Sequence, residues 1–189
     1  MRQFCLLALG LALTVVGKAA AQDTPVLIRG ATILTAADAG RIENGAILFE
    51  NGRISAIGLA SDVQAPSNAT VIDGTDKFVT PGIIDAHSHI AAESINEGSV
   101  SVSSMVSVMD VIDPTDIAIY REAAGGTTTS HVMHGSANPI GGQNAVIKHR
   151  WGEDAEGLLF QGAPPTIKFA LGENPKRSRS AGTGQPQRY

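Results

Sequence analysis

The sequence predicts an α/β fold in which a strand-rich N-terminal segment precedes a strand–helix–strand unit. Three observations lead to this prediction. Residues 25–80 hold short apolar runs separated by turn residues, residues 113–126 carry the start and stop signals of a helix, and an apolar run stands on each side of that helix. A buried strand, a helix and a second buried strand in succession are typical of a βαβ unit and therefore of a parallel sheet.

The first 21 residues are predicted to be a secretory leader and are set aside from the fold. Arg2 precedes an apolar stretch over residues 4–16, and alanines at 19–21 follow it. This is the layout of a signal peptide with cleavage near Ala21. The apolar stretch is shorter than the roughly 20 residues that a membrane-spanning helix needs. We therefore expect an exported protein, periplasmic or secreted, without a stable membrane anchor.

Composition narrows the possible functions. The chain has 14 basic and 18 acidic residues, a formal net charge of −4, and two of the basic residues lie in the leader. Binding to nucleic acid, which relies on a basic surface, is therefore not expected. The single cysteine, Cys5, also lies in the leader, so the rest of the chain has neither a disulfide nor a thiolate ligand. A metal site would need histidine, carboxylate or lysine-derived ligands.

Residues 22–79 are predicted to form a small antiparallel sheet. The runs PVLIRGATIL and GAILFENGRISAIG read as strands, and Asn51-Gly52 stands between the two apolar arms of the second run. An Asn-Gly pair accepts positive φ at both central positions of a type I′ turn, which predicts a β-hairpin at this point. A turn in APSNAT then leads to VIDGTDKFVTPG.

The pattern changes at Pro81, and residues 80–174 are predicted to form a second domain. The run GIIDAHSHI is short and apolar and follows Pro-Gly, as a buried parallel strand would. In DPTDIAIYREAAGG, Asp113 is the expected N-cap, Pro114 suits the first turn, and Gly125 or Gly126 ends the helix.

Further strands are expected in TTTSHVM, AVIKHRW and PTIKFAL. Three segments are expected to be loops: EGSVSVSSMVSVMD, with some extended character, HGSANPIGGQN, with a tight turn at its glycines, and the polar residues 175–189.

The residues best suited to bind a metal lie in the segment VTPGIIDAHSHI. On a strand, side chains alternate between faces, so His87 and His89 point to the same side, with Asp85 one step behind them. Two imidazoles at this spacing can converge on one cation, and zinc readily accepts imidazole nitrogen. Asp85 is expected to orient a ligand histidine or to cap the strand. Alternatively, the pair arose by chance and both rings need other hydrogen-bond partners.

Four segments of the chain, in this order, resemble the amidohydrolase superfamily of metal-dependent hydrolases, in its exported, imidazolonepropionase-like branch. They are VIDGTDKF, VTPGIIDAHSHI, AGGTTTSHVMHGSANPIGGQNAVIKHRWG and IKFALGENPKR. The resemblance covers nearly all of residues 25–189. It implies a small β-sandwich-like domain, to which residues 22–79 belong, followed by the start of a (β/α)8 TIM-type barrel in residues 80–174. It also implies that His87 and His89 are metal ligands at the carboxyl end of the first barrel strand.

The resemblance implies an enzyme that hydrolyses carbon–nitrogen bonds other than peptide bonds, in small molecules of the cyclic amide or amidine type. Its cofactor would be one or two divalent ions, with zinc expected, which activate water to hydroxide. A (β/α)8 barrel takes about 250 residues, and the residues after Val79 are too few for it. We therefore expect this chain to be an N-terminal fragment with little activity of its own, lacking the family's late aspartate.

Five other residues are candidates with weaker support. His134 is expected to line the substrate site, whereas His131 has the opposite strand parity, and His149 is expected at the surface. Lys168 and Glu173 match residue types with which the family completes its metal site, as a carboxylated lysine or a glutamate from a middle strand.

Two alternatives stay open at this point. One is a non-catalytic periplasmic relative that serves as a binding or scaffold module, and the other is a dipeptidase of the same superfamily. The sequence leaves the substrate, the metal, the catalytic acid–base residue and the oligomeric state undetermined.

Overall fold

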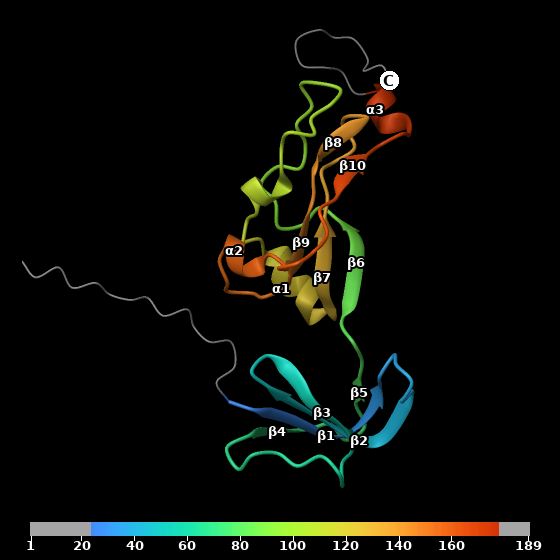
Figure 1. Cartoon of the computed structure of the whole chain (residues 1–189), viewed down its shortest axis with the longest axis vertical. Coiled ribbons are helices and arrows are strands. Elements are labelled where there is room, and N and C mark those ends of the chain that lie inside the picture. The colour runs from blue at the N-terminus through green and yellow to red at the C-terminus, as the bar shows by residue number, and fades with distance from the viewer. Residues whose placement is uncertain (1–23, 178–189) are drawn as a thin grey trace, which may run out of the picture. The chain divides into compact units, whose positions relative to one another are not determined.

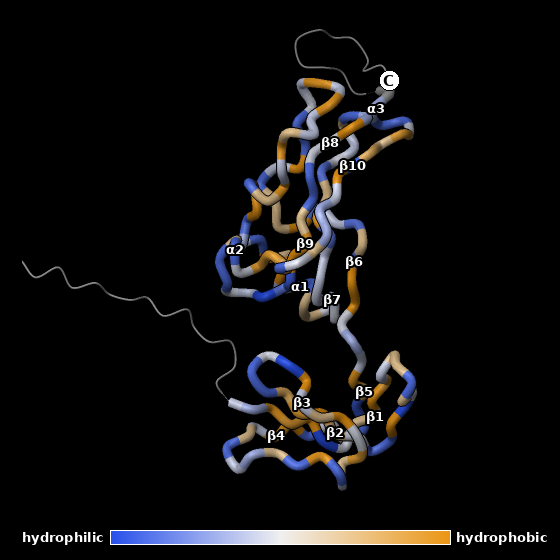
Figure 2. Tube along the Cα trace, viewed as in Figure 1, coloured by the Kyte–Doolittle hydropathy of each residue, from blue (hydrophilic) through white to orange (hydrophobic). Residues whose placement is uncertain are grey.

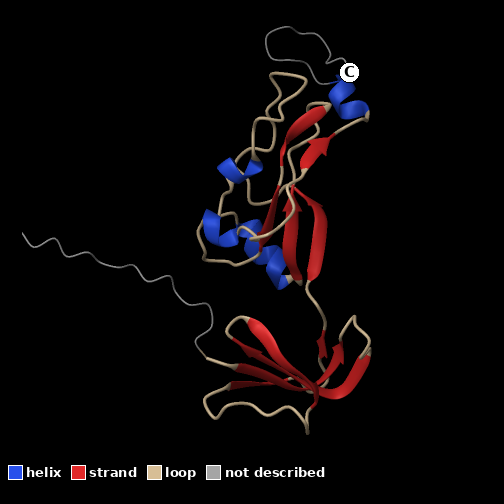
Figure 3. Cartoon of the chain, in the orientation of Figure 1, coloured by secondary structure: helices blue, strands red, loops and turns tan. Residues whose placement is uncertain are grey.

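The computed structural model describes residues 24–177, which divide into two compact units at Pro81 and Gly82. The predicted leader and residues 178–189 of the predicted tail lie outside the described residues. Strands predominate in the described chain and its helices are short (Figures 1 and 3). Within residues 24–177, no helix is both long enough and apolar enough to cross a membrane.

The first unit is a five-stranded sheet with mixed strand directions. β1 pairs antiparallel with β2 and β2 with β3, whereas β4 and β5 both pair parallel with β1. The expectation of a purely antiparallel sheet is therefore wrong, because after β3 the chain returns alongside β1 in the same direction. The strands are β1 (Val26–Leu34), β2 (Arg41–Glu50), β3 (Arg53–Leu59), β4 (Thr70–Asp73) and β5 (Phe78–Val79).

The predicted hairpin is confirmed. Asn51 and Gly52 connect β2 to β3 with φ values of 51° and 71°, the left-handed backbone that a type I′ turn requires at both positions.

Apolar side chains cover both faces of this sheet, and Figure 2 shows hydrophobic residues in orange along its strands. Leu27 and Leu48 pair across β1 and β2 on one face, and Ile28 and Ile47 pair on the other. Gly30, with φ of 86°, is an extra residue in β1 where the strand register shifts. Because of this β-bulge, the side chains of Ala31 and Ile33 lie on the same face of the sheet as Ile28 and not on the opposite face.

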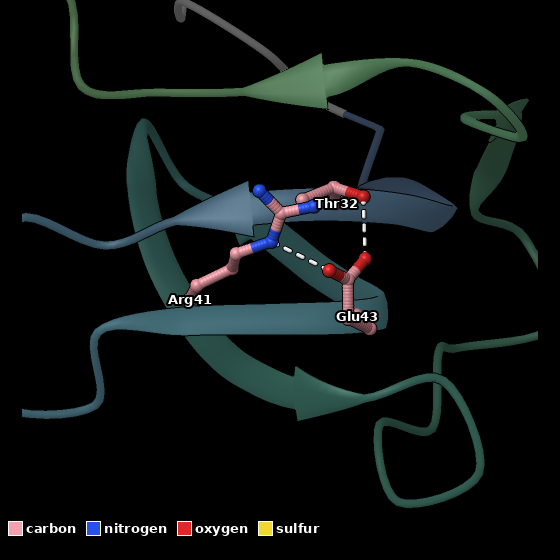
Figure 4. A network of polar contacts seen from close by, with 3 residues as sticks. All are labelled: Thr32, Arg41 and Glu43. Atoms are coloured by element: carbon pink, nitrogen blue, oxygen red, sulfur yellow. Dashed lines mark hydrogen bonds and ion pairs between the residues drawn. The ribbon is translucent and has the colours of Figure 1, made fainter.

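A polar network ties the ends of β1 and β2 together (Figure 4). The Thr32 hydroxyl donates to Glu43 Oε2 at 2.8 Å, and Arg41 Nε donates to Glu43 Oε1 at 2.5 Å. The Arg41 and Thr32 donors lower the pKa of Glu43 below its usual value. Arg41 and Glu43 are exposed and Thr32 is half-buried, so this network contributes little stability beyond holding the register.

The second unit contains the βαβ arrangement that the sequence predicts. β6 and β7 are parallel neighbours, and α1 lies between them in the chain. β9 pairs antiparallel with β7, and β8 pairs antiparallel with β10 in a separate two-stranded sheet. Its elements are β6 (Ile83–Ser88), the 3₁₀ helix η1 (Val108–Val111), α1 (Ile117–Ala124), β7 (Thr127–Val132), β8 (Ile140–Gln143), β9 (Ala145–Lys148), α2 (Ala155–Leu158), β10 (Ile167–Phe169) and α3 (Glu173–Arg177).

The core of this unit forms where α1 and α2 meet the three-stranded sheet. Ile119 from α1, Ile147 from β9 and Leu158 from α2 are all 0% exposed and belong to one apolar cluster. Burying a side chain of this size stabilises a fold by about 1.5–3 kcal/mol, so the cluster holds the strands that carry the histidines.

The start of α1 differs from the prediction. Asp116 is the N-cap, and its Oδ1 accepts a hydrogen bond from the backbone N–H of Ala118 at 2.9 Å. Asp113 instead accepts bonds from the N–H and hydroxyl of Thr115, which forms a turn ahead of the helix and keeps Pro114 outside it. Gly125 ends the helix, as predicted.

Three further expectations for this unit need correction. The segment around Gly141 is strand β8, where a loop was predicted, because its small residues allow close packing against neighbours. The predicted loop over residues 97–110 enters η1 at its end. The polar segment that was expected to be a loop from residue 175 continues α3 as far as Arg177.

Candidate metal centre

The two histidines of the His-Ser-His segment lie side by side at the end of β6. His87 is in the strand, His89 follows directly after it, and Ser88 between them is buried at 7% exposure. The centroids of the two imidazole rings are 5.3 Å apart, and the rings make an angle of 78°. The predicted convergence of the two rings on one side of the strand is therefore present.

A backbone carbonyl orients the ring of His89. His89 Nδ1 lies 2.9 Å from the carbonyl oxygen of Met133, directly after β7. Because a carbonyl only accepts, Nδ1 carries the hydrogen and Nε2 keeps its lone pair. This is the arrangement in which a histidine is held for metal binding, with one ring nitrogen bonded to a carbonyl and the other available.

Lys168 is the closest charged partner of His87. Its Nζ lies 3.3 Å from His87 Nε2, and the lysine side chain is only 5% exposed on β10. The positive charge of Lys168 is the largest cause that lowers the pKa of His87, followed by burial and by His89 and His131, while Asp85 opposes them. His87 is therefore kept neutral, the form in which imidazole binds a cation.

Close packing around Gly141 places Lys168. β10 pairs with β8 through Ile167 with Gln143 and Phe169 with Ile140, so Lys168 lies in the middle of the pairing. A Cβ atom at Gly141 would stand 3.2 Å from the Cβ of Lys168. Strand periodicity gave no signal for this contact, because Lys168 and His87 are 81 residues apart. Only the family resemblance named Lys168 as a candidate for the metal site.

Two aspartates shape the backbone around the histidines. Asp85 Oδ1 accepts the backbone N–H of His87 at 3.0 Å, so Asp85 orients the main chain and not a histidine ring. Asp116 Oδ2 accepts the N–H of Ala91 at 2.8 Å and thereby fixes the loop that follows His89 to the start of α1.

His131, and not His134, lies on β7 beside the candidate metal ligands. His131 lies on β7 between the residues that pair with Asp85 and Ser88, the stretch of β6 that carries His87. Its Nε2 is 2.8 Å from the hydroxyl of Thr166. The earlier preference for the other histidine assumed a regular strand, but β7 ends at Val132.

His134 is buried, at 2% exposure, and both its ring nitrogens are bonded to backbone. Nδ1 lies 2.8 Å from the Gly135 carbonyl, and Nε2 accepts the N–H of Glu97 at 2.9 Å. The ring contributes to a cavity of about 230 Å³ together with Val106 and neighbours on residues 94–111. Its role in substrate binding stays a prediction, and neither nitrogen is open to a metal.

The two remaining candidates lie elsewhere. His149 is half-buried, with Nε2 2.9 Å from the Ser130 hydroxyl, so the expectation of a surface position is wrong. It follows β9, whose pairing with β7 brings the ring against that serine. Glu173 is the exposed first residue of α3, and its role as a ligand stays a prediction.

The donors fit a cation only in part. Within residues 24–177, no three histidine, aspartate, glutamate or cysteine side chains gather as a metal-binding set. His87 and His89 offer two imidazoles on one side of β6, and Lys168 offers a nitrogen beside them. Imidazole suits zinc and similar divalent metals, and two imidazoles make half of a tetrahedral zinc site.

Comparisons with known proteins agree with one another, although no family model matches the chain. The chain is 32% identical over 164 residues to amidohydrolase tasK of Hapsidospora irregularis, covering 75% of this chain and 16% of that protein. It is 33% identical over 100 residues to a 5-methylthioadenosine/S-adenosylhomocysteine deaminase of Carboxydothermus hydrogenoformans, covering 53% of this chain and 23% of that enzyme.

The structure is similar to an amidohydrolase from Thermotoga maritima, with a TM-score of 0.71 and 35% identity, over 80% of this chain and 40% of that one. The chain thus spans less than half the length of each of these relatives. Imidazolonepropionases, such as that of Idiomarina loihiensis with 36% identity over 63 residues, are also among its relatives. The relatives that this chain resembles in sequence and in fold are members of the amidohydrolase superfamily.

Proposed function

We propose that the protein hydrolyses a carbon–nitrogen bond of a small molecule and that His87 and His89 are ligands of its divalent metal. One observation carries this proposal: the two rings converge 5.3 Å apart at a strand end, next to a buried lysine. We further propose that β6 and β7, with α1 between them, are the first two strands of a (β/α)8 barrel. The first unit would then belong to a small β-sandwich.

His87 and His89 would hold the cation through their Nε2 atoms. The His89 lone pair already points away from the carbonyl bond at Nδ1, and His87 is kept neutral. A divalent cation bound there lowers the pKa of a coordinated water and polarises the bond to be cleaved. Asp85 and Asp116 hold the backbone on both sides of the pair, which limits how far the rings separate.

Lys168 would serve the site after losing its positive charge. As an ammonium, it repels a cation and occupies the lone pair of His87 Nε2. Among the described residues, no carboxylate forms an ion pair with it. Attack of the neutral amine on carbon dioxide would form an N–C bond, release one proton to solvent and leave a carbamate with two oxygen donors. The change from positive to negative charge makes the lysine a ligand.

The relatives support the substrate class. They include a deaminase and imidazolonepropionases, and we propose a cyclic amide, amidine or related small molecule for this protein. The leader pattern in residues 1–21 supports export to the periplasm or the medium.

Metal binding by this 189-residue chain tests the proposal, because His87, His89 and Lys168 all lie within it. Zn²⁺ affinity is measured by competition with a chromophoric chelator, with and without bicarbonate, for the wild type, His87→Ala, His89→Ala and Lys168→Met. We expect at least about tenfold weaker binding in both histidine variants. Bicarbonate should tighten binding in the wild type but not in Lys168→Met.

His149→Gln is the matched control, since it removes a half-buried imidazole that bonds to Ser130 and not to the metal ligands. Equal Zn²⁺ affinity in the wild type, His87→Ala and His89→Ala would refute the proposed site. A loss of affinity in His149→Gln as large as in the other histidine variants would mean that the zinc binds nonspecifically.

A further inference from the structure

A directed chain of hydrogen bonds runs from the end of β7 to His131. It begins at the backbone N–H of His134, which donates to Oδ1 of Asn144 at 3.1 Å. Since a backbone N–H only donates, this bond identifies the oxygen of the Asn144 amide. The amide nitrogen, Nδ2, then faces Oγ1 of Thr166 at 3.0 Å and is the donor there.

The next bond in the chain concerns the one hydrogen that the Thr166 hydroxyl itself donates. Thr166 Oγ1 receives a hydrogen from Asn144 and has one hydrogen of its own to place. In the described part of the chain its other partner is His131 Nε2, at 2.8 Å. Donation to Nε2 places this hydrogen within the protein, and a neutral His131 then carries its proton on Nδ1.

The buried position of Asn144 makes this chain rigid. Its side chain is 7% exposed, and its backbone N–H also donates to the Thr166 carbonyl at 3.0 Å. Thr166 is thus held by Asn144 at two atoms. Unpaired polar groups at such a depth cost about 1–3 kcal/mol each, so the arrangement resists rearrangement.

We propose that Asn144 and Thr166 are positioning residues that hold His131 as the Nδ1–H tautomer, so that His131 offers a hydrogen-bond donor beside His87 and not a lone pair for the metal. The donor would meet a carbonyl oxygen or ring nitrogen of the substrate. This last step rests on the proposed function, whereas the tautomer itself does not.

Nitrogen-15 NMR of histidine-labelled chain tests the tautomer. The chain has five histidines, and His131→Gln identifies the signals of His131. At a pH well above the ordinary pKa of histidine, we expect a protonated Nδ1 and an unprotonated Nε2. Thr166→Val removes the hydroxyl and should move the proton toward Nε2, while Thr166→Ser keeps the hydroxyl and should retain the wild-type pattern.

Asn144→Asp reverses the chain without changing its shape. A carboxylate takes the Thr166 hydrogen, so Thr166 can only accept from His131, and the proton should move to Nε2. Should the buried carboxylate prevent folding, the valine and serine variants decide alone. A proton on Nε2 in the wild type, or an identical pattern in Thr166→Val, would overturn the assignment.

Adding Zn²⁺ separates this inference from the proposed function. We expect the ring nitrogens of His87 and His89 to shift and those of His131 to keep the Nδ1–H pattern. If His131 Nδ1 lost its proton to zinc, the donor role would be wrong. If no histidine responded, the metal site would be wrong while the tautomer assignment stood.

Discussion

Replacing Gly141 by alanine should destabilise the second unit by about 1–3 kcal/mol, the usual cost of overpacking a filled site. A Cβ atom there would stand 2.6 Å from Nδ1 of His134 and 3.2 Å from Cβ of Lys168. The His134 ring is 2% exposed. It yields only by breaking its bonds to Gly135 and Glu97, which are worth about 1 kcal/mol each.

Urea denaturation followed by the fluorescence of Trp151 measures this cost, because Trp151 is the single tryptophan and lies in the second unit. Gly172→Ala is the control, since nothing lies within 4 Å of its added Cβ. We expect a lower urea midpoint at unchanged slope for Gly141→Ala, and a midpoint near that of the wild type for Gly172→Ala. Equal midpoints for the two variants would show that the glycine packing has no energetic role.

Four other outcomes are expected. In Lys168→Met, NMR titration should show a higher pKa for His87, because the main cause of its lowered pKa is removed; an unchanged pKa would contradict this. In the wild type, the pKa of His87 is lower in the folded chain than in the unfolded chain, so the unfolded chain binds more protons as pH falls below 6.5. His87 therefore lowers the free energy of unfolding as pH falls through this range, and urea midpoints measured across pH should decline. Asp116→Ala should cost about 1–3 kcal/mol, since it removes both a helix cap and the acceptor of the Ala91 N–H; a midpoint equal to wild type would argue against the tether. Gly30→Ala should cost about 1 kcal/mol in the first unit through its φ of 86°, measured by circular dichroism on heating, and an unchanged transition would refute the strain.

Local patterns predicted much of the fold because the physics behind them is local. The Asn51-Gly52 turn follows from backbone conformations that these two residues readily adopt. The convergence of His87 and His89 follows from the two-residue period of a strand. The N-cap of α1 was placed at the wrong aspartate, because Asp113 and Asp116 both suit a cap and only the contacts with Thr115 and Ala91 separate them.

The choice between His131 and His134 could not be made from the strand period for a similar reason. A parity argument holds only while a strand continues, and β7 ends at Val132. Beyond that point, the direction of the His134 ring depends on Gly135 and Glu97, one of which lies 37 residues away in the chain.

By itself, the sequence determined most of the strands, the helix α1 and the pair of neighbouring imidazoles, since each depends on residues within a few positions of one another. Strand β8, which was expected to be a loop, is the exception. Only the tertiary structure decided what stands beside that pair. Lys168 reaches His87 across 81 residues because β10 pairs with β8 and packs against Gly141. The charge of that lysine is the largest cause of the lowered pKa of His87, and such a long-range contact has no local signature in the chain.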